Sequence, residues 1–403
     1  MIQKGKTLFK LATAINSSNP KEKEVLKNNV IDMSYMFYNS NSTTLDVSNF
    51  NTSKVTNMAR MFFNTKATVL DLSNFNTNKV TSMSGMFYHA NTSNLDISSF
   101  NTSNVTNMVG MFNGSNATTI YGLEKLDTSN VTDMTCMFCE SNVSTLKLNN
   151  FNTSKVTNMH QMFAYSKATI LDVSKFDTSK VTDMTNMFYS TSTTTLDVSG
   201  FNTSNVKRMY GMFYHTNVSS LDLSNFNTSN VTDMIGMFNG SKATTIKGLD
   251  SFNTSNVTDM TCMFCDSYVS TLDLKKFNTA KVNSMKNMFM NTKATTIDVS
   301  NFNTGNVTDM SYMFYGTKST TLDISLFNTN KVTDMSYMFY NTKAKTIYSS
   351  DKFVTNSVTN SSNMFANATS LVGGNGTVYN SSNTDKTYAR IDTASTPGYF
   401  TSK

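Results

Sequence analysis

The stretch LDVSNFNTSKVTNM, residues 45–58, contains two different hydrophobic periods. In its first part apolar Leu45 and Val47 alternate with polar Asp46 and Ser48. A period of two is typical of a β-strand with one buried face and one solvated face. This part of the stretch therefore predicts a half-buried strand.

The second part of the stretch changes period. Its apolar residues follow the spacing i, i+3, i+6 and i+7 of one helix face: Val55, Met58, Met61 and Phe62. That spacing predicts a short α-helical or 3₁₀ segment, and Thr52 or Ser53 just before it is a candidate N-cap. One unit therefore reads as strand, turn, short helix, turn.

The same unit recurs along the chain. A Met-Phe pair begins at 36, 61, 86, 111, 137, 162, 187, 212, 237, 263, 288, 313, 338 and 364, so the spacing is 25 or 26 residues over fourteen copies. A unit of this length cannot bury its own apolar face, whereas stacked copies can, and the repeat therefore predicts a solenoid. The motif contains 27 of the 29 Met residues. We expect them to form core columns with Phe and not a set of copper or haem ligands.

A longer repeat of 126 residues, five units, relates two cysteine pairs. Cys136 and Cys139 in DMTCMFCE recur as Cys262 and Cys265 in DMTCMFCD. Strands stacked about 4.8 Å apart would place the two pairs roughly 24 Å from each other, too far to share one zinc ion. Drift at tolerant positions, a disulfide within each pair and a separate metal at each pair remain as alternatives.

Composition limits the classes of partner. The net charge of +6 comes from 33 Lys and Arg against 27 Asp and Glu, and only Arg60, Arg208 and Arg390 are Arg. The charge is dispersed and forms no basic stripe, so we expect no nucleic-acid partner. No apolar run is long enough for a membrane span, and Lys10 interrupts the apolar part of the N-terminus, so we expect neither membrane insertion nor a Sec signal in this chain.

Signatures of catalysis are missing from the sequence. It contains no Walker loop, no GxGxxG and no HExxH. None of its three His, His89, His160 and His215, lies in a recognisable pattern with a nucleophile. We therefore expect a protein that is not an enzyme, with no catalytic residues, no resident metal and no cofactor.

The repeated phrase and the C-terminal segment SLVGGNGTVYNSSNTDKTYARIDTASTPGYF, residues 370–400, resemble the BspA-like leucine-rich repeat surface proteins. The resemblance covers about residues 30 to 403. It implies an α/β fold, a right-handed solenoid of the leucine-rich-repeat type with about 14 strand and short-helix repeats and a cap at each end. It also implies a role in adhesion or recognition without catalysis.

Two columns of side chains are candidate ligand-binding residues. The position after the first Leu or Ile of each predicted strand holds nine carboxylates: Asp46, Asp71, Asp96, Asp172, Asp197, Asp222, Asp273, Asp298 and Asp323. Neighbouring like charges repel, so local hydrogen bonds, divalent cations such as Ca²⁺ or sugar hydroxyls should offset them. A second column follows the Met-Phe pair and contains Tyr38, Tyr88, Tyr189, Tyr214, Tyr315 and Tyr340, with Phe63 at the equivalent place. Tyrosine is common at interfaces, although half-buried packing would explain this column equally well.

Solenoids need covered ends, and the sequence predicts three parts. Residues 1–30 differ in composition and read as an N-terminal cap or attachment segment, residues 31–365 form the solenoid, and residues 366–403 form a C-terminal cap.

Taken together, these features predict a non-enzymatic recognition protein. Its partner would be a protein or glycan on a host cell or bacterial envelope. Two settings are open: a bacterial surface adhesin, and a phage or virion tail or receptor-binding component that assembles into a larger structure. An intracellular scaffold is a third alternative. The first two place the protein outside the cell, on a cell surface or on a virion.

Overall fold

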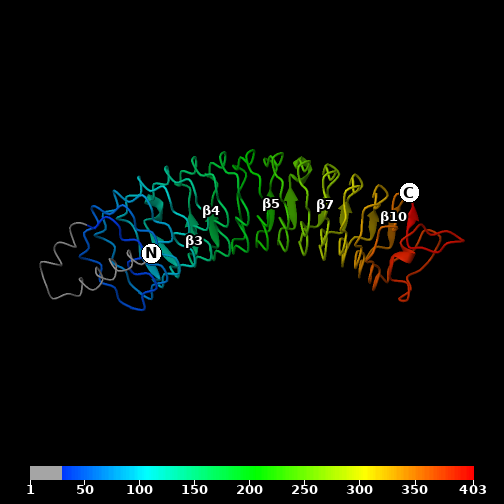
Figure 1. Cartoon of the computed structure of the whole chain (residues 1–403), viewed down its shortest axis with the longest axis horizontal. Helices are drawn as coiled ribbons and strands as arrows, with labels where there is room; N and C mark the ends of the chain where they lie inside the picture. Colours follow the sequence, from blue (N-terminus) through cyan, green and yellow to red (C-terminus); the bar gives the residue numbers. More distant parts are fainter. Residues whose placement is uncertain (1–29) are drawn as a thin grey trace. The chain divides into compact units, whose positions relative to one another are not determined.

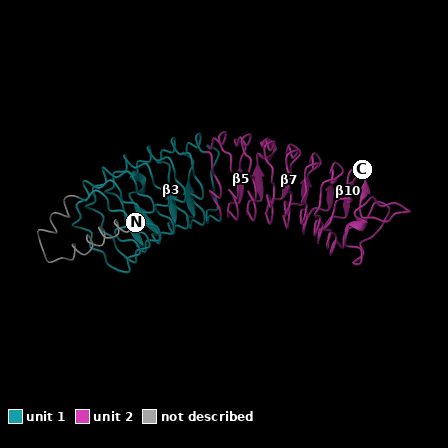
Figure 2. Cartoon of the chain, in the orientation of Figure 1, with its two compact units in different colours: residues 1–181, 190–200 teal, residues 182–189, 201–403 magenta. Residues whose placement is uncertain are grey.

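The computed structural model describes residues 30–403, which divide into two compact units (Figure 2). Unit 1 contains residues up to 181 together with 190–200, and unit 2 contains 182–189 together with 201–403. The predicted N-terminal segment, residues 1–30, falls outside the described residues apart from Val30.

Each unit is a stack of turns joined by short parallel strands (Figure 1). Unit 1 contains β1 (Asn94–Asp96), β2 (Thr119–Tyr121), β3 (Thr145–Lys147) and β4 (Ile170–Asp172). Unit 2 contains β5 (Ser220–Asp222), β6 (Thr245–Lys247), β7 (Thr271–Asp273), β8 (Thr296–Asp298), β9 (Thr321–Asp323), β10 (Thr346–Ser349) and the C-terminal β11 (Thr401–Ser402). Paired residues of β1 to β10 are one repeat apart, as in Leu95 with Ile120 and Leu272 with Ile297, and β11 pairs with β10.

The strands have the half-buried pattern that the sequence predicts. In β1, β3, β5 and β7 the central Leu is buried and both flanking residues are exposed. One buried residue per strand is enough to complete the core, because the strand is only one edge of each turn and other segments supply the rest of the buried side chains. The prediction of a repetitive solenoid is confirmed.

The α/β part of the prediction is wrong. Between residues 30 and 403 the only helices are three single-turn 3₁₀ segments, η1 (Leu123–Lys125), η2 (Leu249–Ser251) and η3 (Lys386–Tyr388). Ten solenoid turns carry a strand of three or four residues, fewer than the fourteen strand and helix repeats expected. The fold is therefore a β-solenoid of the right-handed type with about ten strand-bearing turns and almost no helix.

Left-handed backbone conformations explain why the predicted helix is absent. Two residues in each Met-x-x-Met-Phe segment have positive φ: the one before the second Met and the second one after Phe. The first set begins with Tyr35 (φ 61°), Arg60 (56°) and Gly85 (59°), and the second with Asn39 (55°), Asn64 (49°) and His89 (48°). A residue in the left-handed region ends a right-handed helix, so the segment forms consecutive turns.

These turns connect neighbouring repeats by backbone hydrogen bonds. The amide groups of Tyr35 and Phe37 donate to the carbonyls of Ala59 and Met61 in the next turn, at 3.0 and 2.8 Å. The amide of Met36 instead donates within its own turn, to the Met33 carbonyl at 3.3 Å. The amides of alternate residues therefore donate to the next turn, and the amides between them donate within their own turn.

The predicted N-cap has a different role. Thr52 is buried, its hydroxyl donates to the Asn76 carbonyl of the next turn at 3.0 Å, and its Oγ1 accepts from the Asn76 amide at 2.7 Å. Thr77 makes the same donor contact with Asn101, at 2.8 Å. The position is thus a link between turns and not a helix cap.

The Met and Phe columns form the core of both units. Met58, Met61 and Phe62 are fully buried, and the equivalent residues of later turns are buried in the same way. Phe rings of successive turns stack with centroids 5.4–6.0 Å apart, as in Phe112 with Phe138 and Phe264 with Phe289. Offset stacking of this kind adds to the hydrophobic stabilisation of each ring.

Residues 366–403 pack on the last turn of unit 2. Tyr399 and Phe400 are buried against Phe365, with ring centroids 5.1 and 6.0 Å away. The segment also accepts hydrogen bonds from amides of the last turn: Phe365 donates to the Thr384 carbonyl at 2.9 Å. Without it, these amides would lack the partner that the next turn provides elsewhere.

A glycine pair tests the geometry of the turns. Gly248 has φ of 86°, and a Cβ there would lie 2.5 Å from the Ser224 amide nitrogen, whereas Gly305 has no positive φ and space for a Cβ. Gly248→Ala should lower the free energy of unfolding by more than about 2 kcal/mol because strain and overlap with backbone add. Gly305→Ala, the control, should be neutral. Denaturant unfolding curves of both variants measure this, and equal stabilities would contradict the turn geometry.

Candidate functional site

Six members of the predicted carboxylate column end a strand, and all nine accept a hydrogen bond that closes a local turn. Asp46 Oδ1 accepts hydrogen bonds from the Ser48 amide at 3.1 Å and the Ser48 hydroxyl at 2.6 Å. Asp71, Asp172, Asp222, Asp298 and Asp323 accept both bonds from the Ser two residues on. Asp197 does the same with Ser199, Asp96 accepts the Ser98 amide, and Asp273 accepts the Lys275 amide at 3.3 Å. Repulsion between neighbouring carboxylates of the column is therefore offset by hydrogen bonds from the residue two places on.

These hydrogen bonds change the acidity of the column. The Ser48 hydroxyl and amide hold the pKa of Asp46 below its ordinary value, because they stabilise the ionised form. Ser224 lowers the pKa of Asp222 in the same way. Asp46 and Asp222 therefore favour the charged form, with Oδ1 engaged and oriented.

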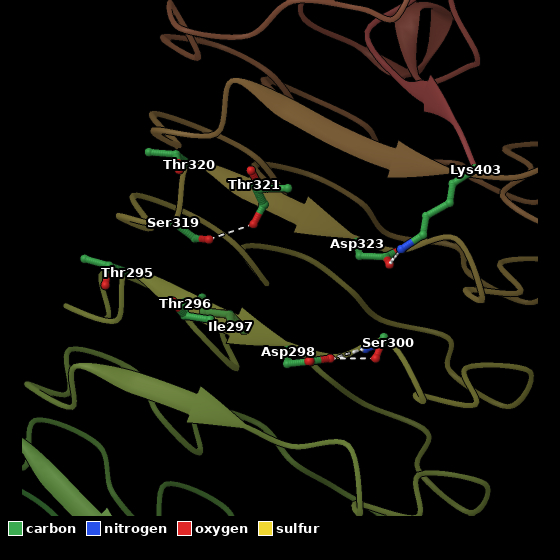
Figure 3. Close-up of a pocket in the computed structure, with 10 residues that line it drawn as sticks. All are labelled: Thr295, Thr296, Ile297, Asp298, Ser300, Ser319, Thr320, Thr321, Asp323 and Lys403. Carbon is green, nitrogen blue, oxygen red and sulfur yellow. Dashed lines mark hydrogen bonds and ion pairs between the residues drawn. The ribbon is translucent and has the colours of Figure 1, made fainter.

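One part of the column lies in a polar groove on unit 2 (Figure 3). The groove has a volume of about 440 Å³ and crosses β8 and β9. Its lining consists of Thr295, Thr296, Ile297, Asp298, Ser300, Ser319, Thr320, Thr321, Asp323 and Lys403. The threonines lie at the start of the two strands and the carboxylates at their end, where Lys403 reaches in from the C-terminus.

The charges of the groove are paired. The Lys403 ammonium forms a short ion pair with Asp323, and Lys275 lies 3.2 Å from Asp298 Oδ2. Burial opposes ionisation of both carboxyls, but hydrogen bonds from Lys403 and Ser325 outweigh it and lower the pKa of Asp323. Ser300 and Lys275 lower the pKa of Asp298 in the same manner. The groove therefore presents oriented, charge-balanced polar groups.

The predicted tyrosine column forms stacks. Phe63 lies between Tyr38 and Tyr88, with ring centroids 4.6 and 4.3 Å away, and Tyr189 stacks on Tyr214 at 4.4 Å. Tyr38 is exposed, and the other five tyrosines are half-buried. Burial raises the pKa of Tyr88 and Tyr214. Much of each ring is thus engaged with its neighbours.

The last pair of the column belongs to a cluster of four rings. Tyr315 stacks on Tyr340 at 4.7 Å, and beside them Tyr312 stacks on Tyr337 at the same distance. The Tyr340 hydroxyl accepts a hydrogen bond from Asn367 at 2.8 Å. The cluster is a rigid aromatic surface separate from the groove lining.

Of the fifteen predicted residues, the groove contains two, Asp298 and Asp323. The residues named as candidates from the sequence include neither the groove's hydroxyl residues nor Lys403. The Thr-Thr before Leu-Asp or Ile-Asp, present at four of the nine carboxylate positions and including 295–298 and 320–323, was an available signal. No local signal places Lys403, because it contacts a residue 80 positions away.

The predicted absences can be compared only with residues 30–403. Within that range no three His, Cys, Asp or Glu side chains gather as a set of metal ligands. Among the same residues no helix has the length and apolar character needed to cross a lipid bilayer. Binding of Ca²⁺ by the carboxylates stays a prediction.

The Lys403–Asp323 ion pair should make the stability of the fold depend on pH. Because the folded pKa of Asp323 is lowered, its ionisation stabilises the fold above pH about 4, and this contribution is lost as pH falls through the folded pKa. Lys403→Met should raise that pKa, and its loss of stability should be larger at pH 7 than at pH 3. A ¹³C-carboxyl NMR titration with melting curves measures both effects. Lys318→Met is the charge-matched control, and an unchanged Asp323 titration would contradict the pairing.

Comparisons with known proteins identify a family. No curated protein matches the chain, and no solved structure does. A family model described as "Mycoplasma protein of unknown function, DUF285" matches four tandem, overlapping segments, residues 5–121, 115–221, 208–296 and 267–378. The resemblance to BspA-like proteins stays a prediction. The four matches cover most of the sequence, and the chain therefore belongs to the DUF285 family.

Proposed function

We propose that the protein is a non-enzymatic recognition protein whose groove on β8 and β9 binds a neutral saccharide. The observation that carries the proposal is the groove's lining: five Ser and Thr hydroxyl residues on the two strands and their edges, with Ser300 and two carboxylates at one end. Sugars present hydroxyls that both donate and accept hydrogen bonds. Hydroxyl side chains can do either, and carboxylates accept only.

The groove is organised before any ligand arrives. Ser300 and its carboxylate partner Asp298 are joined at 2.6 Å, and the Ser319 hydroxyl donates to the Thr321 carbonyl at 2.7 Å. Thr296 and Thr321 are exposed on the neighbouring strands β8 and β9. Groups that are already fixed lose little entropy on binding, which favours affinity for a rigid ligand such as a sugar ring.

The charge pattern favours a neutral ligand. Asp323 is paired with Lys403 and Asp298 with Lys275, so the groove offers no unpaired ammonium to an acidic sugar. An acidic sugar would instead approach two carboxylates at close range, which is unfavourable. Neutral hexoses and N-acetylhexosamines avoid this cost.

The aromatic cluster of Tyr312, Tyr315, Tyr337 and Tyr340 supports a recognition role independently. Tyrosine is enriched where proteins bind partners. Stacking between the turns holds these four rings in one arrangement. A partner on a cell surface, protein or glycan, could use this cluster. Both settings considered for the sequence, a bacterial adhesin and a virion component, need such a surface.

The binding proposal is tested with the full chain and a panel of immobilised neutral and acidic oligosaccharides, followed by calorimetry on each one that binds. Thr321→Val and Asp298→Asn should each weaken binding about tenfold, because each removes or alters a hydrogen bond to the ligand. Neutral sugars should bind and acidic ones should not.

The chain provides matched controls. Thr119→Val changes an exposed strand threonine of unit 1, and Asp71→Asn alters a carboxylate bonded to its Ser just as Asp298 is. Both control variants should bind as the wild type does. Failure of every neutral sugar to bind, or equal affinity in the groove and control variants, would overturn the proposal.

A further inference from the structure

The two cysteine pairs lie in turns of identical form, one in each unit. Cys136 and Cys262 have positive φ, 54° and 57°, and all four thiols are free. The Cys139 amide donates to the Cys136 carbonyl at 3.2 Å, and Cys265 makes the same bond to Cys262, also at 3.2 Å. Each pair therefore occupies the first and fourth positions of a closed turn, which brings their Cα atoms within about 7 Å.

Other repeats show how side chains at these two positions meet. Four repeats have Gly at the first position, and a Cβ placed there would lie close to the Cβ of the residue three places on. The Cβ–Cβ distances are 3.8 Å for Gly85 and Tyr88, 3.8 Å for Gly110 and Asn113, 3.6 Å for Gly211 and Tyr214, and 3.9 Å for Gly236 and Asn239. Disulfides need about 3.5–4.5 Å between Cβ atoms. The turn itself thus supplies the spacing of a disulfide.

Repeats with two aromatic residues at the same two positions also bring these side chains close together. The rings of Tyr35 and Tyr38 are 5.5 Å apart, and those of Tyr312 and Tyr315 are 5.7 Å apart. Both side chains therefore leave the turn on the same side. Two thiols at these positions point toward one another, because the backbone is the same.

We propose that each cysteine pair is a dithiol site that closes to a disulfide within its turn by exchange with a low-molecular-weight disulfide. In the first step the thiolate of Cys262 attacks one sulfur of the disulfide and releases one thiolate. In the second step Cys265, as thiolate, attacks Sγ of Cys262 and releases the other. The two cysteine protons pass to the two released thiolates, so one disulfide is consumed and two thiols are formed.

The surroundings assign the attacking sulfur. Cys262 is half-buried, and a hydrogen bond from the Cys265 thiol lowers its pKa to about 7. The Asn287 amide group also donates to Cys262 Sγ, at 3.5 Å. Cys265 is 2 % exposed, and its hydrogen bond to Cys262 together with burial raises its pKa. Cys262 is therefore the nucleophile and Cys265 the resolving thiol.

The pair in unit 1 should react more slowly. The Cys139 thiol lowers the pKa of Cys136 too, but Cys136 donates its own proton to Gln161 Oε1 at 3.4 Å. That bond stabilises the thiol form, whereas Asn287 stabilises the thiolate of Cys262. Beside Cys262 the negative charge of Asp266 is opposed by the positive charge of Lys286, whereas Glu140 and Asp133 add only negative charge beside Cys136.

The test uses the reduced full chain and oxidised glutathione. Samples are quenched with iodoacetamide over time, digested and analysed by mass spectrometry. We expect linked Cys262–Cys265 and Cys136–Cys139 peptides, each lacking two hydrogens and carrying no alkyl group, with the first pair forming several-fold faster. Stable glutathione adducts on the wild type, links between chains, or alkylation of all four thiols would each overturn the proposal.

Two variants distinguish an effect of the turn geometry from a failure of the variant to fold. Cys265→Ser should accumulate a stable glutathione adduct on Cys262, because the resolving thiol is gone, and absence of that adduct would contradict the assignment. Tyr312→Cys with Tyr315→Cys, in a chain whose four cysteines are changed to Ser, should also close to a disulfide. If this pair stays reduced while circular dichroism shows native folding, the turn does not set the spacing and the proposal fails.

Discussion

Backbone hydrogen bonds between successive Met-x-x-Met-Phe turns are the interaction on which the rest of the structure depends. All of those bonds run the same way, from the amides of one turn to the carbonyls of the next, as in Tyr312 to Ser336 and Phe314 to Met338. They require left-handed residues, and non-glycine residues such as Tyr337 and Cys262 adopt that conformation at a cost of about 1–2 kcal/mol each. The ladder and the stacked Phe column offset that cost, so the segment is held by its neighbours and not by its own propensity.

This arrangement leaves polar, aromatic and thiol side chains at the outer edges of the turns. With the core fixed by Met and Phe, the strand edge carries hydroxyl and carboxylate side chains in register, and the turn carries aromatic or thiol pairs. The groove forms where two such strands, β8 and β9, meet the C-terminal Lys403. The cysteine pairs use the same turn positions as Tyr312 and Tyr315, so one backbone supports an aromatic surface in some repeats and a dithiol in others.

The sequence predicts the elements that depend on nearby residues and misses those that depend on distant ones. Alternation of an apolar residue with Asp is enough to predict strands such as β7 and β9, although residues 45–48 themselves form no strand. The constant repeat gives the column to which Asp298 and Asp323 belong. The helix prediction failed because the spacing of Val55, Met58 and Met61 fits a row of turns as well as it fits a helix. Gly85, Gly110 and the Asn residues at the left-handed positions were the signal that separates the two. Lys403 reaches Asp323 only through the folded C-terminal segment, which no local pattern encodes.

Amide hydrogen exchange measured residue by residue would test the ladder most directly. The ladder predicts that the amides of Tyr312, Phe314 and Gly316, although they lie in turns, exchange as slowly as the amide of Ile324 at the end of β9, since all four donate to a carbonyl of the next repeat. Rapid exchange at these three positions beside slow exchange at Ile324 would show that the turns are held only by side-chain packing. That result would contradict the central role of the backbone ladder.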